Sequence, residues 1–328
     1  MQTIENSSFL LALKGQNQKK VPVWFMRQAG RFLPSYREFR KKHSLLDLFF
    51  TPDLAAKITL LPVQELGVDA AILFSDITVV ALSLGQKLDF QEGPRIEPLF
   101  DIKAMQSCSF FDLTPLEPIF QTIEKVKKES PVPLIGFCGA PFTVASYLVE
   151  GGEASLKEMM RKEPKIVHHF FDLLTKLSIA YLLEQKKRGI DAFQLFDTWI
   201  CLLSQEEVQE FALPYYRQIF EKIDLPGILF GKSLSSYLDF VVDLPCALSL
   251  DSSISLAEVR KKTGQTLQGN LDPDLLFKPL EEIEKKVREL KEEMQEDSAW
   301  ILGLGHGIKP NTPVDAVRKI VEILKKIE

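Results

Sequence analysis

Short apolar runs recur along the chain, and each has the length of a β-strand. Eight of them cover residues 21–26, 70–75, 133–137, 192–196, 227–230, 246–250, 266–269 and 300–305. The runs are continuously apolar rather than alternating, which is typical of strands that are buried on both faces of a parallel sheet. Segments with helical periodicity separate them. The pattern therefore predicts an α/β fold in which strands and helices alternate.

The predicted helices cover residues 54–67, 116–129, 164–189, 206–223, 255–264 and 280–295. Three of them end at Gly67, Gly189 and Gly264, where a left-handed residue is expected to cap the helix. The adjacent pair His168-His169 lies inside one of these helices. Neighbouring residues cannot share a helix face as metal ligands four residues apart do, so we expect a surface or packing role for both histidines.

Eight buried strands with crossover helices predict one (β/α)8 TIM barrel that spans residues 1–328 as a single domain. A doubly wound open sheet is the structural alternative, although no obvious glycine-rich fingerprint turn follows a strand. Residues 77–112 are expected to form an insertion after the second strand. In a barrel of this kind the active site lies at the C-terminal ends of the strands.

Composition narrows the possible functions. The 328 residues carry a formal charge of −5, which argues against general nucleic-acid affinity. The four cysteines show no C-x-x-C spacing, which suits reduced thiols in a cytosolic protein. The first residues contain no basic leader or cleavage site, and we find no apolar run of the roughly 18–20 residues that a membrane span needs. We expect a cytoplasmic protein that binds neither nucleic acid nor membrane.

Polar and titratable residues collect where the predicted strands end. They are Arg27 to Arg31, Ser75-Asp76, Tyr147, Asp197-Thr198, Asn270 with Asp272, and His306. An aspartate after a strand is as often a helix N-cap as a catalyst, and for Asp76 both interpretations stay open. Asp272 precedes Pro273 and fits a cap or turn better.

The first strand is followed by two arginines that small residues separate. The planar guanidinium of Arg27 or Arg31 suits carboxylates and phosphates. A surface salt-bridge cluster is the alternative, and we favour it for the other basic residues of this segment, Arg37, Arg40, Lys41 and Lys42. His306 lies between glycines that allow close approach of a ligand. A phosphate-binding loop with an incidental histidine remains the alternative there.

Five blocks of sequence carry a family resemblance. They are PVWFMRQAGRFLPSYREFR (22–40), DAAILFSDI (69–77), GFCGAPFTVASYLVEG (136–151), QGNLDP (268–273) and GLGHGIKPNTP (303–313). Together they resemble the uroporphyrinogen decarboxylase family over nearly the whole chain. The resemblance implies a (β/α)8 barrel, a homodimer, and an enzyme without metal or organic cofactor. It also implies removal of carboxyl from the four acetate arms of uroporphyrinogen, giving coproporphyrinogen in haem biosynthesis.

The resemblance also assigns roles to residues. It implies Asp76, Arg27 and Tyr147 as catalytic residues, with Asp76 beneath the pyrrole N–H groups. The residues that it implies for substrate binding are Arg27, Gln28, Ala29, Gly30, Arg31, Asp76, Tyr147, Thr198 and His306. The proton donor stays open, because an arginine side chain does not readily give up its proton. We expect a water molecule or a substrate carboxyl held by Arg27 to supply it.

The chain departs from the family after the fourth strand, where Asp197-Thr198-Trp199 replaces a usual Glu-Ser. Thr198 keeps a hydroxyl for a substrate arm. Asp251-Ser252 likewise replaces a common Asp-Trp after the sixth strand. A methyltransferase on the same barrel is one alternative, but it would need a His-x-Cys zinc site, which is absent around His306. A tetrapyrrole carrier, which would bind without turnover, stays open as the second alternative.

Overall fold

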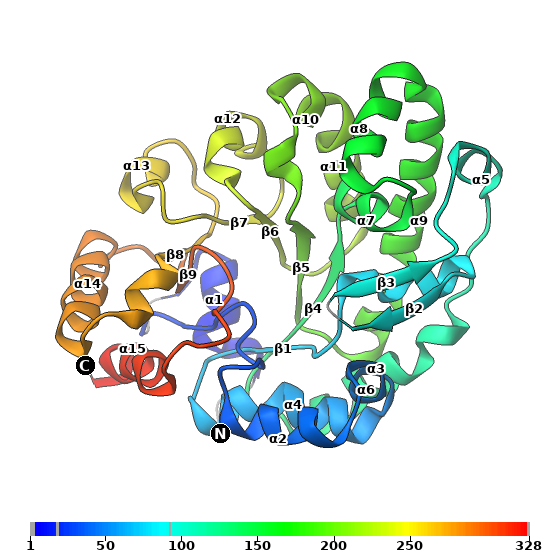
Figure 1. Ribbon diagram of the computed structural model, residues 1–328. Coiled ribbons are helices and arrows are strands. Elements are labelled where there is room, and N and C mark those ends of the chain that lie inside the picture. The colour runs from blue at the N-terminus through cyan, green and yellow to red at the C-terminus, as the bar shows by residue number, and fades with distance from the viewer. Residues whose placement is uncertain (1–3, 18–19, 92, 327–328) are drawn as a thin grey trace.

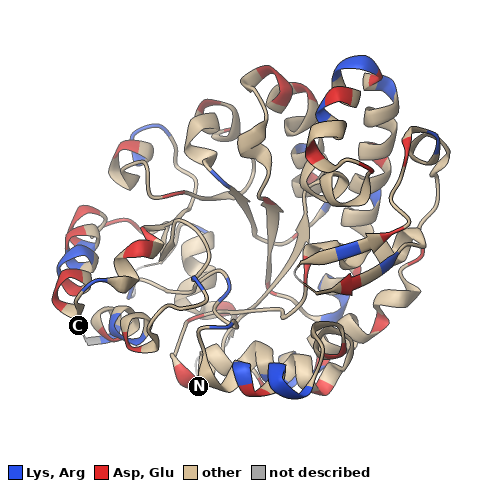
Figure 2. Ribbon diagram, viewed as in Figure 1, with Lys and Arg blue, Asp and Glu red and all other residues tan. Residues whose placement is uncertain are grey.

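Within residues 4–17, 20–91 and 93–326, which the computed structural model describes, one parallel sheet of seven strands forms the centre of the molecule. Its order is β1 (Ala71–Ile72), β4 (Leu134–Gly139), β5 (Ala192–Asp197), β6 (Gly227–Gly231), β7 (Ala247–Ser249), β8 (Leu267–Leu271) and β9 (Trp300–Leu304). Figure 1 shows the helices arranged around these strands. Charged residues lie mostly on the outer helices, the loops and the β2–β3 hairpin and are scarce on the strands of the central sheet (Figure 2).

The predicted first strand, 21–26, is not a strand in the structure but still closes the barrel. Val23 forms an isolated parallel bridge with Leu302 of β9. On its other side the Val23 carbonyl accepts a hydrogen bond from Asp69 N at 2.8 Å. Pro22 has no N–H to add to a ladder, so the pairing stays short. This segment joins β9 to the start of β1, and the predicted α/β barrel is confirmed.

Helices cover the outside of the barrel. They are α1 (Ser8–Leu13), α2 (Pro34–Lys42), α3 (Leu45–Phe50), α4 (Pro52–Glu65), α5 (Ile102–Ser107), α6 (Glu117–Glu129), α7 (Pro141–Leu148), α8 (Gly152–Lys162), α9 (Pro164–Arg188), α10 (Gln205–Phe211), α11 (Leu213–Lys222), α12 (Leu238–Val241), α13 (Leu256–Arg260), α14 (Leu280–Glu293) and α15 (Val314–Lys326). The expected helix 206–223 is divided at Ala212, because Pro214 cannot donate within a continuous helix. Gly67 and Gly189 are left-handed caps as expected, but α13 ends before Gly264.

The long helix α9 has the length and composition of a membrane span, but 56% of its most apolar window is buried inside the protein. Gln185 ties it to β4, because its side chain accepts from Phe137 N at 3.1 Å and donates to Phe137 O at 2.9 Å. His168 stacks on Phe211 with 4.6 Å between ring centroids, which confirms its packing role. The helix therefore belongs to the packed outer layer of the barrel.

Residues 77–112 form the expected insertion after β1. They contain the 3-10 helix η2 (Ile77–Leu84), an antiparallel hairpin of β2 (Lys87–Phe90) and β3 (Pro94–Glu97), and α5. Phe90 packs edge-on against Phe49 of α3, with ring centroids 5.5 Å apart. The hairpin is thereby held beside the C-terminal ends of the strands, where Pro94 helps to line a cavity.

Candidate active site

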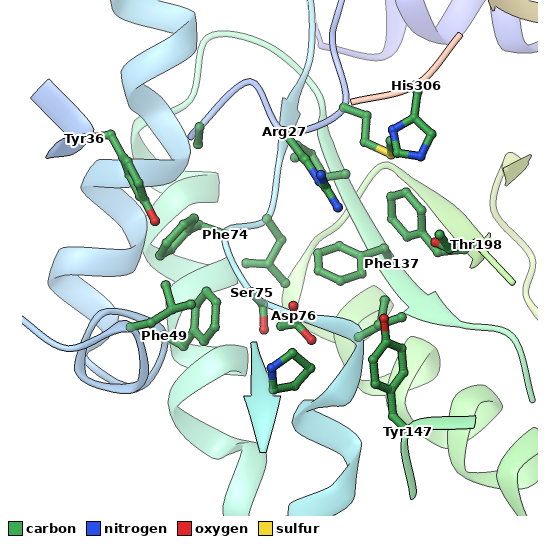
Figure 3. Close-up of a pocket in the computed structure, with 18 residues that line it drawn as sticks. Arg27, Tyr36, Phe49, Phe74, Ser75, Asp76, Phe137, Tyr147, Thr198 and His306 are labelled. Atoms are coloured by element: carbon green, nitrogen blue, oxygen red, sulfur yellow. The ribbon is translucent and has the colours of Figure 1, made fainter. Parts of the chain in front are cut away.

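A cavity of about 380 Å³ lies at the C-terminal ends of the strands. Six of the nine predicted site residues line it: Arg27, Ala29, Asp76, Tyr147, Thr198 and His306. They come from the segments after β1, β5 and β9, from α7 and from the turn before α2. Figure 3 shows the labelled side chains around the cavity. Residues more than 270 positions apart in the sequence thus meet at one site, as the barrel topology predicts.

Asp76 is both a cap and a cavity residue. One carboxylate oxygen, Oδ1, accepts from Thr78 N at 2.8 Å and from the Thr78 hydroxyl at 2.6 Å, which caps η2. No donor to Oδ2 is found among the described residues. Figure 3 shows the carboxylate beside Ser75 in the cavity. The cap interpretation of this aspartate is confirmed, and the cap leaves one carboxylate oxygen uncommitted at the cavity.

Arg27 has a left-handed backbone, with φ of 63°. Few residues other than glycine adopt this conformation, and it is often found at functional sites. Two glycines make room for it. A Cβ on Gly307 would lie 2.7 Å from Arg27 Cδ, and a Cβ on Gly30 would lie 2.7 Å from the Arg27 carbonyl oxygen. Gly307, which follows His306, and Gly30 therefore accommodate the arginine.

Gln28 does not line the cavity. Its side chain is 1% exposed, accepts from Phe25 N at 3.0 Å and donates to Ala70 O at 3.0 Å. These two bonds tie the Arg27 turn to the start of β1. Gly30 and the exposed Arg31 are also outside the cavity lining. The positive charge of Arg31 does act on buried Tyr36, a lining residue whose pKa is raised mainly by burial.

Tyr147 and His306 offer hydrogen-bond donors. Burial raises the pKa of the Tyr147 hydroxyl, so it stays protonated at neutral pH. Burial, followed by the charge of Arg27, lowers the pKa of His306 to about 4, so its ring is neutral. His306 Nδ1 accepts from Gly307 N at 2.8 Å. The proton of the neutral ring is therefore on Nε2.

Aromatic rings form one wall of the site. Phe137 of β4 meets Phe196 of β5 at 5.5 Å, and Phe196 meets Phe230 of β6 at 5.7 Å, in edge-on geometry. Phe230 in turn lies 5.5 Å from the His306 ring. We did not predict these phenylalanines as site residues. For Phe196 the signal was its position two residues before Thr198, because alternate strand residues share a face.

Asp197, the last residue of β5, is outside the cavity. It is fully buried, and its two oxygens accept hydrogen bonds from the hydroxyls of Thr143 and Tyr216. Burial raises its pKa to about 6. The Thr143 hydroxyl also accepts from Trp199 N at 3.0 Å. This network fixes the segment that presents Thr198 to the cavity.

Two other strand-end residues are structural. Asp272 accepts from Asp274 N at 2.8 Å and caps a short helix, as predicted. Asn270 donates to the carbonyls of Asp251 and Ile254. In the part of the chain that the structure describes, no group of three or more His, Cys, Asp or Glu side chains is arranged to hold a metal ion.

Solved structures resemble the chain in fold. A methyltransferase from Methanosarcina mazei superimposes with a TM-score of 0.83 at 22% identity, covering 97% of each chain. A B12-independent methionine synthase from Shewanella sp. W3-18-1 gives a TM-score of 0.53 at 12% identity, covering 84% of this chain and 87% of that one. At these identities the likeness shows the barrel alone.

Sequence relatives are much more similar. A uroporphyrinogen decarboxylase from Protochlamydia amoebophila is 42% identical over 334 residues, which is 98% of this chain and 92% of that protein. Those from Desulfotalea psychrophila and Thermus thermophilus are each 38% identical, with 98% of this chain and 98% or more of theirs covered. The family model described as uroporphyrinogen decarboxylase (URO-D) matches residues 4–327. The chain therefore belongs to the uroporphyrinogen decarboxylase family.

Proposed function

We propose that this cavity decarboxylates the four acetate arms of uroporphyrinogen to give coproporphyrinogen and carbon dioxide, without a cofactor. One observation carries the proposal. The uncommitted oxygen of Asp76 and the cation of Arg27 line the same cavity, whose wall includes aromatic rings. A flexible macrocycle of electron-rich pyrroles, with N–H groups that converge at its centre and carboxylates at its edge, is complementary to such a site.

The substrate itself provides the electron sink. Protonation of a pyrrole carbon next to the acetate-bearing carbon makes the ring cationic. The carbon–carboxylate bond then breaks, its electron pair neutralises the ring, and carbon dioxide leaves. A second proton converts the resulting exocyclic methylene to a methyl group, and the proton that was first added to the ring carbon is lost, which restores the pyrrole. This sequence places on the substrate the work that an organic cofactor does in other decarboxylases.

Asp76 supplies the fixed negative charge that the ring cation needs. Its Oδ1 is held by Thr78, so Oδ2 is already oriented before the substrate binds. A charge that needs no reorganisation during the reaction stabilises the transition state by several kcal/mol in a site that excludes water. Asp76 Oδ2 accepts the pyrrole N–H hydrogen bonds, which strengthen as the ring becomes positive.

The remaining cavity residues bind the arms of the substrate. Arg27 pairs with a carboxylate, while Tyr147, Thr198 and the Nε2–H of His306 donate hydrogen bonds. Arg27 keeps its own proton, so the acid is a water molecule or a substrate carboxyl that Arg27 holds. Gln28 and Gly30 act indirectly, by holding the turn that carries Arg27, and Arg31 acts at the edge of the site.

We further propose that the protein is a cytoplasmic homodimer whose residues 1–328 act as one domain, and that it binds neither nucleic acid nor membrane. The family resemblance supports the dimer. The net charge of −5 and the four free cysteines are in keeping with the remaining points.

The direct test is to incubate the purified protein anaerobically with uroporphyrinogen and to measure coproporphyrinogen and carbon dioxide. We expect four carbon dioxide molecules per substrate, against a control without protein. The altered segment Asp197 to Trp199 makes a tetrapyrrole carrier the alternative. Tight binding of uroporphyrinogen with no product would favour the carrier and contradict the proposal.

A further inference from the structure

Lys232 follows β6 directly and lies at the same rim as Thr198. In the parallel register of β5 and β6, Asp197 pairs with Gly231, so the next two residues, Thr198 and Lys232, are neighbours. Thr198 lines the cavity although it is one residue beyond the end of β5. The ends of the two strands thus bring a hydroxyl and an ammonium group to adjacent positions.

The direction of β6 indicates where the Lys232 side chain lies. Phe230 pairs in register with Phe196, a cavity residue, and its ring contacts both Phe196 and His306. Phe230 therefore faces the interior of the barrel. Side chains on a strand alternate, so we place Lys232, the first residue after the strand and two residues beyond Phe230, on the same side as Phe230 and at the edge of the cavity rather than in its lining. The pair Phe196 and Thr198 on β5 has the same arrangement and lines the cavity.

The Lys232 ammonium has no ion pair or hydrogen bond among the residues that the structure describes, and the residue is exposed. Its charge reaches the site, because it adds to burial and Arg27 in lowering the pKa of His306. Lys309 is a useful contrast. Its charge also acts on His306, but its ammonium pairs with Asp274. Lys232 is thus a cation at the cavity rim that the protein itself does not neutralise.

The segment after β6 is held in place by Asp251. One oxygen of this carboxylate accepts from Ser235 N at 3.2 Å and from the Ser235 hydroxyl at 2.8 Å. The other accepts from Ser253 N at 3.1 Å. Ser233 has a left-handed backbone with φ of 57°, which turns the chain immediately after Lys232. Asp251 therefore fastens the segment after β6 to the segment after β7, and this limits how far Lys232 can move.

We propose that Lys232 binds a substrate carboxylate that is kept through the reaction, a propionate rather than a reacting acetate. The inference rests on the proposed function and extends it. Decarboxylation removes negative charge from the carboxylate that reacts. A cation fixed on that carboxylate would stabilise the bound substrate more than the transition state and would slow the reaction. An unpaired cation at the rim therefore assists catalysis only where the carboxylate stays.

The test compares Lys232→Gln with the matched control Lys309→Gln. Both variants remove one lysine charge that acts on His306. We expect Lys232→Gln to raise the KM for uroporphyrinogen and the Kd for coproporphyrinogen by the same factor, about fivefold, as one partly exposed ion pair gives. Its kcat should stay within about twofold, Lys232→Arg should restore both constants, and Lys309→Gln should change them less than about 1.5-fold.

An unchanged Kd for coproporphyrinogen in Lys232→Gln would overturn the inference, and so would a lower kcat at constant KM. A higher KM for uroporphyrinogen with unchanged product affinity would place Lys232 on a reacting acetate and also contradict it. Product binding is measured by anaerobic equilibrium dialysis, without turnover. Failure of the wild-type protein to decarboxylate is therefore distinguishable from failure of the lysine role.

Discussion

Asp76 lies in the segment after β1 and Asp197 is the last residue of β5, but the surroundings of the two aspartates differ. Asp197 is fully buried, and the hydroxyls of Thr143 and Tyr216 occupy its two oxygens. Asp76 lines the cavity, and Thr78 occupies one of its oxygens. The comparison teaches that the position after a strand does not by itself bring an aspartate into the cavity. Of these two aspartates, only Asp76 presents an uncommitted oxygen to the cavity, which is the property that the proposed catalytic role requires.

The difference arises from where the partners are in the sequence. Thr78 is two residues after Asp76, and such a local cap restrains the side chain without enclosing it. The partners of Asp197 are 54 residues before it, on α7, and 19 residues after it, on α11. Two helices packed over β5 close this carboxylate off from solvent. Asp197 therefore supports the segment that carries Thr198, while Asp76 faces the cavity.

The largest expected effect is on the reaction itself. In Asp76→Asn the side chain keeps an oxygen that can accept from Thr78, so the fold and the cap should persist. The negative charge under the ring is lost, and we expect kcat to fall about 10³-fold, as for other preorganised charges. Anaerobic assay of coproporphyrinogen formation measures it, together with the thermal unfolding midpoint. Turnover within about twofold of the wild type would remove the catalytic role from Asp76.

Asp272→Asn is the matched control for this variant. Asp272 also follows a strand and also caps a short helix through a backbone N–H two residues on, at 2.8 Å. It is outside the active-site cavity. We expect kcat within about twofold of the wild type. A comparable loss of activity in both variants would mean that the caps, rather than the cavity charge, support turnover.

The next effect is on stability. Asp197→Ala removes two hydrogen bonds to a buried carboxylate and leaves the hydroxyls of Thr143 and Tyr216 without this acceptor. Because buried polar groups without partners are costly, we expect the free energy of unfolding to fall by about 3–4 kcal/mol. Urea denaturation measures it. Asp76→Ala, whose cap is at the cavity surface, should lose only about 1 kcal/mol. Equal losses would abolish the contrast between the two aspartates.

The pH dependence of stability gives a third effect. Burial raises the pKa of Asp197 to about 6 in the folded protein, so the folded state keeps this proton longer than the unfolded state does. The stabilisation that this raised pKa gives to the folded state is fully present below about pH 4. As the pH rises through 6 it is lost, and the free energy of unfolding falls by at most about 3 kcal/mol. The pKa of His306, lowered to about 4, works in the opposite direction.

Comparing the wild type with Asp197→Asn isolates the aspartate, since His306 is common to both proteins. Urea denaturation at several pH values should show the wild type losing stability relative to the variant between about pH 4 and 7. A difference that does not change with pH would mean that Asp197 ionises in the folded protein as readily as in the unfolded chain.

Much of the fold could be predicted from the sequence, because buried parallel strands leave continuous apolar runs and helices leave a period of 3.6 residues. The segment 21–26 was expected as a strand, yet it makes only one bridge, to Leu302 of β9, because Pro22 has no N–H with which to extend the ladder. An insertion was predicted over residues 77–112, but the hairpin of β2 and β3 within it was not. Its two short strands alternate in burial and lack the continuous apolar pattern.

The site was predicted in part for a similar reason. Motif blocks identified Arg27, Asp76 and His306, which do meet in the cavity. The same blocks could not distinguish residues that line the cavity from residues that hold the lining residues in place. Gln28 belongs to the latter group, because its side chain bonds to the backbone of Phe25 and Ala70. That distinction depends on which way a side chain points after the chain has packed. Lys232 lies outside the motif blocks, so only the register of β5 and β6 brings it to the rim.

The smallest expected effect tests how Asp197 reaches the active site. Thr198→Val removes one hydroxyl from the cavity and should raise the KM for uroporphyrinogen about threefold with kcat nearly unchanged. Asp197→Asn disturbs the bonds that hold this segment, through Thr143 and Trp199, and should raise KM by a similar factor. If Asp197 acts only by positioning Thr198, the KM of the double variant should be no higher than the larger KM of the two single variants. If the two increases in KM multiply in the double variant, Asp197 influences substrate binding by a second route. Steady-state kinetics of the wild type, the two single variants and the double variant distinguishes these outcomes.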